Sequence, residues 1–176
     1  MASGDTLIFL DPLGAVSPPT AFATRDILAT TTDVPLISIP VLDFAGSTAN
    51  ESMDWHITVP SNYSGTTGFT FSVQYASDGT VAGTVEWEIR AVTFVDGNDL
   101  SADLNIDGAT AATVTDTLPG DPETDKFNQV ATVALAKASM GTPSAGDRMV
   151  IRVTRDQATD TSTDDAQLIG IEVRDT

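Results

Sequence analysis

Residues 53–95 read MDWHITVPSNYSGTTGFTFSVQYASDGTVAGTVEWEIRAVTFV, and they contain three runs in which large apolar side chains alternate with polar ones. The apolar positions are Met53, Trp55, Ile57 and Val59 in the first run, Phe69, Phe71, Val73 and Tyr75 in the second, and Val85, Trp87 and Ile89 in the third. A period of two is typical of a β-strand with one buried and one solvated face. The sequence therefore predicts three strands here, with Trp55 and Trp87 in the core.

The connections between these runs have the composition of tight turns. Pro60 ends the first run, Gly65 and Gly68 follow it, and Asp78-Gly79 separates the second run from the third. Glycine tolerates the positive φ angles that such turns require. We therefore predict that the three strands form an antiparallel meander.

The end of the third run has a different pattern, because 91–95 places apolar groups on both faces of the strand. These groups are Ala91, Val92, Phe94 and Val95. A strand of this composition is buried on both faces, bulged, or in contact with another subunit.

Shorter runs complete an all-β pattern. Candidate strands cover 6–11, 34–44, 109–114, 127–138, 149–154 and 169–173, the last with Ile169, Ile171 and Val173 on its apolar face. The alanines of 127–138 would also suit a helix, but its alternation favours a strand. Pro35 and Pro40 remove two backbone donors, which suits an edge or irregular strand. The pattern predicts a jelly-roll β-sandwich of about eight antiparallel strands, with an immunoglobulin-like sandwich as the less favoured alternative.

The 176 residues are expected to form one domain. Residues 1–32 are predicted to be one strand and an extended arm, because Pro12, Gly14, Pro18 and Pro19 cannot sustain a helix or a central strand. Residues 33–176 are predicted to form the sandwich. An extended arm of this kind lies on its own domain or reaches a neighbouring subunit.

Composition excludes several classes of function. The chain has no cysteine, so it has neither disulfides nor thiolate ligands, and it has a single histidine. Its net charge of −17 opposes binding to nucleic acid or to an anionic membrane, and it is explained by solubility or by adaptation to a saline medium. We expect neither a signal peptide nor a membrane helix, because no basic region precedes the apolar run at 7–10 and no apolar run approaches the roughly 20 residues of a spanning helix.

Catalytic candidates are weak. His56, the single imidazole, shares a strand face with Asp54 and Thr58, which could imitate a nucleophilic site, but such faces are common on exposed strands. Glu86 and Glu88 could imitate a glycosidase pair, yet they alternate as ordinary solvent-side residues. We therefore expect no enzyme, no catalytic residue and no cofactor.

Two acidic loops could hold a cation, although neither has the spacing of a known calcium loop. One contains Asp96, Asn98, Asp99 and Asp103, and the other contains Asp156, Asp160, Asp164 and Asp165. We expect no obligatory metal. Among aromatic residues that could stack on a sugar, Trp55, Trp87 and Tyr75 are expected in the core. Tyr63, in a turn, is expected to be available.

Several segments resemble small structural proteins of tailed bacteriophages. They are MASGDTL at 1–7, VLDF at 41–44, PSNYSG at 60–65, GTVEW at 83–87, RVTRD at 152–156 and AQLIGIEV at 166–173. The resemblance implies a single jelly-roll domain that assembles on the outside of a virion, typically as a homotrimer. The matching segments are turns and core strands, so the resemblance bears on the fold and assigns no site residue.

These observations lead to two functional hypotheses. The first is a trimeric capsid decoration or cement protein that binds itself and the major capsid protein on the outer capsid surface. The alternative is a tail-fibre or tail-tip module that binds a host-surface glycan or receptor, with tail proteins as its partners.

Overall fold

The computed structural model describes residues 4–29, 37–46, 49–79, 82–100, 104–118, 126–130 and 132–176. Pro35, Asp103 and the end of the predicted arm at 30–32 lie outside these ranges. The strands are β1 (Thr6–Leu10), β2 (Thr24–Ala29), β3 (Ser38–Phe44), β4 (Glu51–Thr58), β5 (Gly68–Ser77), β6 (Gly83–Phe94), β7 (Ala112–Leu118), β8 (Lys126–Gln129), β9 (Val133–Ala136), β10 (Arg148–Arg155) and β11 (Ala166–Asp175). Two short 3₁₀ helices, η1 (Pro12–Gly14) and η2 (Lys137–Met140), are the helical elements of the described residues.

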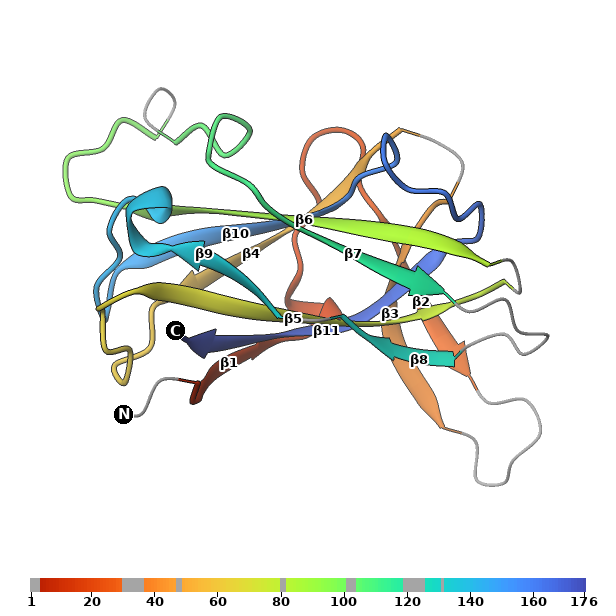
Figure 1. Ribbon diagram of the computed structural model, residues 1–176. Helices are drawn as coiled ribbons and strands as arrows, with labels where there is room; N and C mark the ends of the chain where they lie inside the picture. Colours follow the sequence, from red (N-terminus) through yellow and green to blue (C-terminus); the bar gives the residue numbers. More distant parts are fainter. Residues whose placement is uncertain are drawn as a thin grey trace.

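The strands form two antiparallel sheets that pack face to face (Figure 1). One sheet has the order β2-β3-β11-β5-β8, with β1 also paired to β11 and β9 also paired to β5; the other has the order β4-β10-β6-β7. Because β8 and β9 occupy one position beside β5, the central pattern is β3-β11-β5-β8/β9 opposite β4-β10-β6-β7. This is the strand order of a jelly roll, which confirms the predicted fold class.

The predicted meander is wrong. β4 and β6 both pair with β10, whereas β5 lies in the opposite sheet between β11 and the β8/β9 edge. Both short connections therefore cross from one sheet to the other. Alternation shows only that each strand buries one face. It does not show which strands pair with its edges, and here those strands, β10 and β11, come from distant parts of the chain.

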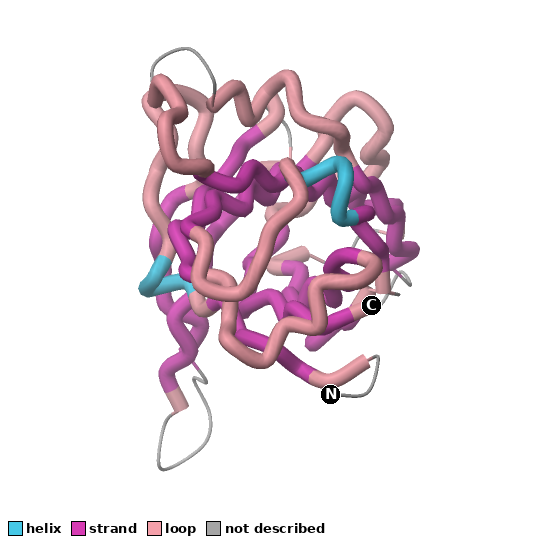
Figure 2. Tube along the Cα trace, turned by 90° about the vertical axis from the view of Figure 1, so that its left-hand side faces the viewer, coloured by secondary structure: helices cyan, strands magenta, loops and turns pink. Residues whose placement is uncertain are grey.

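The buried apolar side chains form one core between the two sheets, and Figure 2 shows the backbone of the molecule turned by 90° from Figure 1. Trp87 is fully buried at its centre, with its ring 5.2 Å from Phe44 and 5.4 Å from Tyr75 between centroids. Trp55 is also buried, and its indole N–H donates to the carbonyl of Asp11 at 2.8 Å. The predicted burial of both tryptophans is confirmed.

The segment that we expected as an extended arm follows its own sandwich. The backbone of Val16 exchanges two hydrogen bonds with Asp54 on the free edge of β4, and Ser52 N donates to Ala21 O at 2.8 Å. The same segment then forms β2, a strand that the sequence did not indicate, which pairs with β3. The arm therefore covers the edge of one sheet and extends the other.

Other boundaries differ in detail. The segment 127–138 forms β8 and β9 and then enters η2, so the choice of strand is confirmed. The weak strand expected at 109–114 is β7, which lies a few residues later. A bulge in β11 between Leu168 and Gly170 turns Ile169 out of the core and Leu168 into it, contrary to the predicted alternation. Pro40 lies in the half of β3 that pairs with β2 alone, so its missing N–H breaks no bond to β11.

Candidate functional site

The catalytic arrangement suggested by His56 is not assembled. Both carboxylate oxygens of Asp54 accept hydrogen bonds from Arg152, at 2.7 and 2.8 Å, so this carboxylate is committed to the guanidinium. The hydroxyl of Thr58 accepts a hydrogen bond from Arg148 at 3.2 Å. His56 itself is exposed on the outer face of β4.

Glu86 and Glu88 have separate partners on the outer face of β6. Glu86 accepts a hydrogen bond from the hydroxyl of Thr115 at 3.0 Å. Glu88 forms an ion pair with Arg90 at 2.8 Å. The two carboxylates therefore act as ordinary surface groups of the sheet.

The expectation that Tyr63 is available for sugar stacking is wrong. Its side chain is 6% exposed, and its ring packs against Phe69 with centroids 4.8 Å apart. Burial and the charge of Asp175 raise the pKa of its hydroxyl. Trp55, Trp87 and Tyr75 are buried in their strands, as predicted. For Tyr63, the position in a turn was a poor guide to exposure.

The second acidic loop is organised by a buried arginine. Arg155 and Asp160 are fully buried and form an ion pair at 2.6 Å. The guanidinium also donates to the carbonyl oxygens of Phe44, Ser162 and Asp164 at 2.8–3.0 Å. Asp156 and Asp165 accept instead from backbone N–H groups at Ala158 and Gly46, so the four candidate carboxylates do not converge.

In the first acidic loop Asp103 lies outside the described residues, and Asp96 and Asp99 belong to no group of three acidic side chains that could hold a metal ion. Asn98 accepts a hydrogen bond from the backbone N–H of Val95 at 2.6 Å, which closes the turn. Across the described ranges, no group of three or more His, Cys, Asp and Glu residues is placed to hold a metal ion. Likewise, no described helix is long and apolar enough to cross a membrane.

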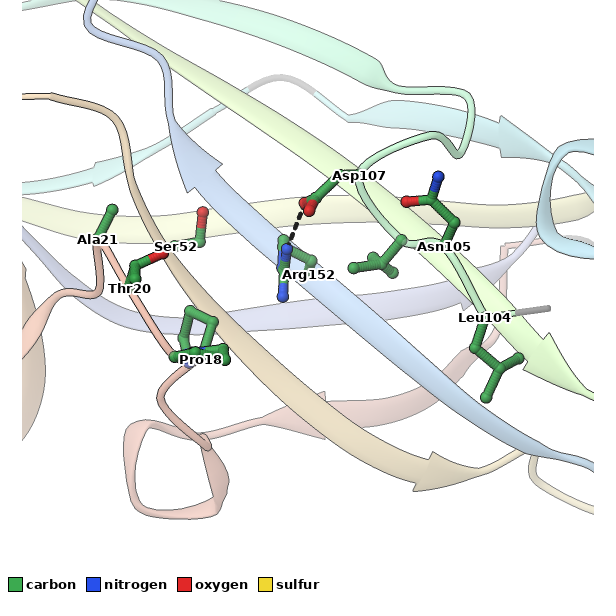
Figure 3. Close-up of a pocket in the computed structure, with 10 residues that line it drawn as sticks. Pro18, Thr20, Ala21, Ser52, Leu104, Asn105, Asp107 and Arg152 are labelled. Atoms are coloured by element: carbon green, nitrogen blue, oxygen red, sulfur yellow. Dashed lines mark hydrogen bonds and ion pairs between the residues drawn. The ribbon is translucent and has the colours of Figure 1, made fainter. Parts of the chain in front are cut away.

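The outer face of the four-stranded sheet carries a groove of about 360 Å³, which we call the outer groove. One wall is the arm at 18–21, the other wall is the loop at 104–107, and the sheet contributes Ser52 and Arg152. Figure 3 shows Arg152 between Thr20 and Ala21 on one side and Asn105 and Asp107 on the other. The groove thus joins three segments that are far apart in the sequence.

Arg152 holds the loop wall against the sheet. Its guanidinium pairs with Asp54 in the neighbouring strand and with Asp107 in the loop, the latter at 2.5 Å. Arg90, directly opposite Arg152 in the register, donates to the backbone carbonyl of Asp107. The hydrogen bonds with Asp54 raise the pKa of Arg152, against the opposing effect of burial, so this group is a permanent cation in the groove.

An apolar hollow of about 200 Å³ adjoins the outer groove. Val92, Phe94 and Val150 line it from the sheet, and His56 and Asp54 lie at its side. Leu104 and Ile106 line both the hollow and the groove. The loop at 104–107 therefore lies beside Val92 and Phe94 at the end of β6, whereas Val95 is 57% exposed.

Fold and groove together define an acidic jelly-roll protein with a mixed polar and apolar depression on one outer sheet. No protein-family model matches the chain, and no curated protein matches it significantly. Among solved structures, the carbohydrate-binding module TmCBM27, described by its specific mannan recognition, is 9% identical over 99% of both chains, with a TM-score of 0.45.

Two larger proteins also match. The enzymatically active domain of tailspike protein 4 from bacteriophage CBA120 is 14% identical with a TM-score of 0.40, over 96% of this chain and 19% of that one. An Arthrobacter globiformis T6 isomalto-dextranase complexed with panose is 18% identical with a TM-score of 0.43, over 91% of this chain and 23% of that one. This chain thus spans a quarter or less of both proteins, and at these scores the likeness carries no argument about function.

Proposed function

We propose that this protein is a non-enzymatic glycan-binding module and that the outer groove and the apolar hollow are its binding site. The composition of the outer groove is the observation on which this proposal rests. The hydroxyl of Thr20 and the side-chain NH2 of Asn105 can form hydrogen bonds with sugar hydroxyls, while Leu104 and Ile106 offer apolar contact. The Ser52 hydroxyl pairs with Thr154, and the Asn105 side-chain oxygen accepts from Gly108 N–H. A few oriented polar groups on an apolar, preformed surface are the usual composition of a small-molecule site.

Neutral sugars suit this site better than polyanions. The net charge of −17 repels highly charged glycans at long range. Within the groove, the guanidinium of Arg152 is paired with Asp54 and Asp107. It therefore positions these two groups, and few of its N–H donors are free to bind a ligand carboxylate. The resemblance to structural proteins of tailed phages supports a place at a tail fibre or tail tip, where such a module would contact the host surface.

Replacing Asn105 or Thr20 by alanine is expected to weaken glycan binding roughly 3–10-fold, the amount expected for one lost hydrogen bond. A glycan array would identify the ligand, and titration calorimetry would measure its affinity for each variant. Thr113→Ala is the matched control, because Thr113 is exposed on the same sheet but outside the groove. The bound glycan should be recovered unhydrolysed.

Failure to bind any neutral glycan would refute this function. An equal loss of affinity in Thr113→Ala would place the binding site elsewhere. Hydrolysis of the bound glycan would contradict the non-enzymatic assignment.

An exposed apolar surface favours a second candidate function, that of a trimeric capsid decoration protein. Leu13 and Ile27 are 71% and 61% exposed, and they flank an open hollow of about 370 Å³ with Pro40. β2, at the end of its sheet, has no second partner strand among the described residues. Exposed apolar residues beside an open sheet edge are typical of an assembly surface. However, the arm, which also suggested a neighbouring subunit, packs along its own chain.

Ile27→Lys is expected to convert an oligomer into a monomer without unfolding it, because a charge on an exposed apolar contact disfavours association and costs little in the isolated chain. Light scattering would measure the mass of the wild type and of the variant. Phe127→Lys is the matched control, since Phe127 is 59% exposed on β8 at the opposite edge of the same sheet. A monomeric wild type that does not bind capsids would eliminate this candidate.

A further inference from the structure

The outer face of the seven-stranded sheet carries carboxylates around Gln167. Asp43 of β3 lies directly opposite Gln167 of β11 in the antiparallel register. Asp165, just before β11, accepts a hydrogen bond from Gly46 N–H at 2.7 Å and is near enough for its charge to act on Asp43. Asp78 follows β5 and accepts a hydrogen bond from the N–H of Asp165 at 3.0 Å. Three neighbouring strands thus contribute to one acidic cluster.

Two oxygen atoms of this cluster are buried without a hydrogen-bond donor. Gln167 is 9% exposed, and its Oε1 is inaccessible and unpartnered. Oδ1 of Asp43 is likewise buried and accepts no hydrogen bond. Side chains directly opposite one another on antiparallel strands lie about 4.5–5.5 Å apart at Cβ, so the two oxygens belong to one small region. Buried acceptors of this kind are rare, because each loses its hydration without compensation.

Among the described residues, the charges that act on Asp43 are those of other carboxylates. Asp165 and Asp78 have the largest effect, followed by Asp26 and Glu51. Arg155 of β10 directs its guanidinium to Asp160 and to backbone carbonyls, not to Asp43.

We propose that Asp43 Oδ1 and Gln167 Oε1 bind a calcium ion on this face, with water molecules completing its coordination and the charge of Asp165 attracting it. Calcium takes six to eight oxygen ligands, and carboxylates, side-chain amide oxygens and water are all suitable. Among the described residues, no three His, Cys, Asp or Glu side chains converge on one point. The proposed site therefore depends on the amide oxygen of Gln167 as well as on a carboxylate. With so few protein ligands, the affinity should be about millimolar, as in extracellular calcium modules.

The ion would connect β3 to β11, and it is expected to raise the melting temperature of the full chain. After treatment with a chelator and dialysis at neutral pH, addition of calcium to about ten times the dissociation constant should raise the melting temperature by roughly 3–6 °C at constant ionic strength. Equilibrium dialysis should find one bound calcium.

Asp43→Asn and Gln167→Leu should both abolish the calcium-dependent shift. Asp43→Asn should also have a higher melting temperature than the wild type without calcium, because a buried like charge has been removed. Asp96→Asn is the matched control: Asp96 is an exposed carboxylate in the turn after β6, and its variant should keep the full shift.

Three results would overturn the proposal. One is a wild type that neither binds calcium in dialysis nor responds to it thermally. Another is an unchanged calcium response in Asp43→Asn. The third is nuclear magnetic resonance evidence that the Gln167 amide N–H donates to Asp43, because the two groups would then satisfy one another without an ion.

Discussion

Arg155→Met is expected to lower the free energy of unfolding by about 3–5 kcal/mol, the cost of removing one partner of a buried ion pair. Arg155 and Asp160 are both fully buried, and methionine would fill much of the space without replacing the charge. Asp160 would be left as an uncompensated buried carboxylate. The carbonyl groups of Phe44, Ser162 and Asp164 would lose their donor as well. Urea denaturation followed by tryptophan fluorescence measures the change.

Arg148→Met is the control for this experiment. Arg148 lies on the same strand but is exposed, and its side chain donates one hydrogen bond, to Thr58. We expect its loss to change the free energy of unfolding by less than about 0.5 kcal/mol. The double variant Arg155→Met, Asp160→Leu should recover part of the loss, because it removes the unpaired charge. A loss below about 1 kcal/mol in Arg155→Met would show that the 156–165 loop does not depend on this guanidinium.

Trp87→Ala is expected to cost about 3–5 kcal/mol of stability through loss of buried apolar surface and creation of a cavity. The ring is fully buried and makes edge contacts with Phe44 and Tyr75, from strands of the opposite sheet. Its removal therefore disrupts packing between the two sheets. Thermal and urea unfolding, monitored by circular dichroism, would measure the loss.

Trp87→Phe should cost less than Trp87→Ala, for two reasons. It retains most of the ring contacts, and it removes an indole N–H that is buried without an acceptor. Phe127→Ala is the surface control, because that aromatic ring is 59% exposed, and it should change stability by less than about 0.5 kcal/mol. A loss below about 1 kcal/mol for Trp87→Ala would contradict a close-packed interface between the sheets.

The outer groove shows why the candidate site was missed in the sequence. Arg152 and Asp54 lie on strands whose alternation predicted their exposure, but nothing in the pattern indicated that they pair. Asp107 and Thr20 lie in segments without periodicity, and their approach to Arg152 depends on the path of two connections over the sheet. The apolar groups at 91–95 were the one sequence signal that pointed to this region, as they required a second cover.

Tyr63 and the acidic loop at 156–165 were misjudged for a similar reason. Turn residues are usually exposed, but the ring of Tyr63 folds back onto Phe69. A run of aspartates suggests a cation, and here the cation is a side chain of the same protein. Arg155 comes immediately before the loop, and the alternation of Met149, Ile151 and Val153 extends to it and places it on the core face. Its partners, Asp160 and the carbonyl of Phe44, depend on the tertiary position of the loop and of β3.

Local physics in the sequence determined the strand content, the buried face of most strands, the burial of both tryptophans and the all-β class, because a period of two and turn-forming residues act over a few neighbouring positions. It also determined the acidic charge and the absence of cysteine chemistry. Tertiary structure alone decided which strands pair, that the arm covers the edge of β4, and that Arg152, Asp107 and the arm form one groove. These features depend on contacts between residues up to a hundred or more positions apart, such as Arg152 with Asp54 and Arg155 with Phe44, and no local pattern encodes such contacts.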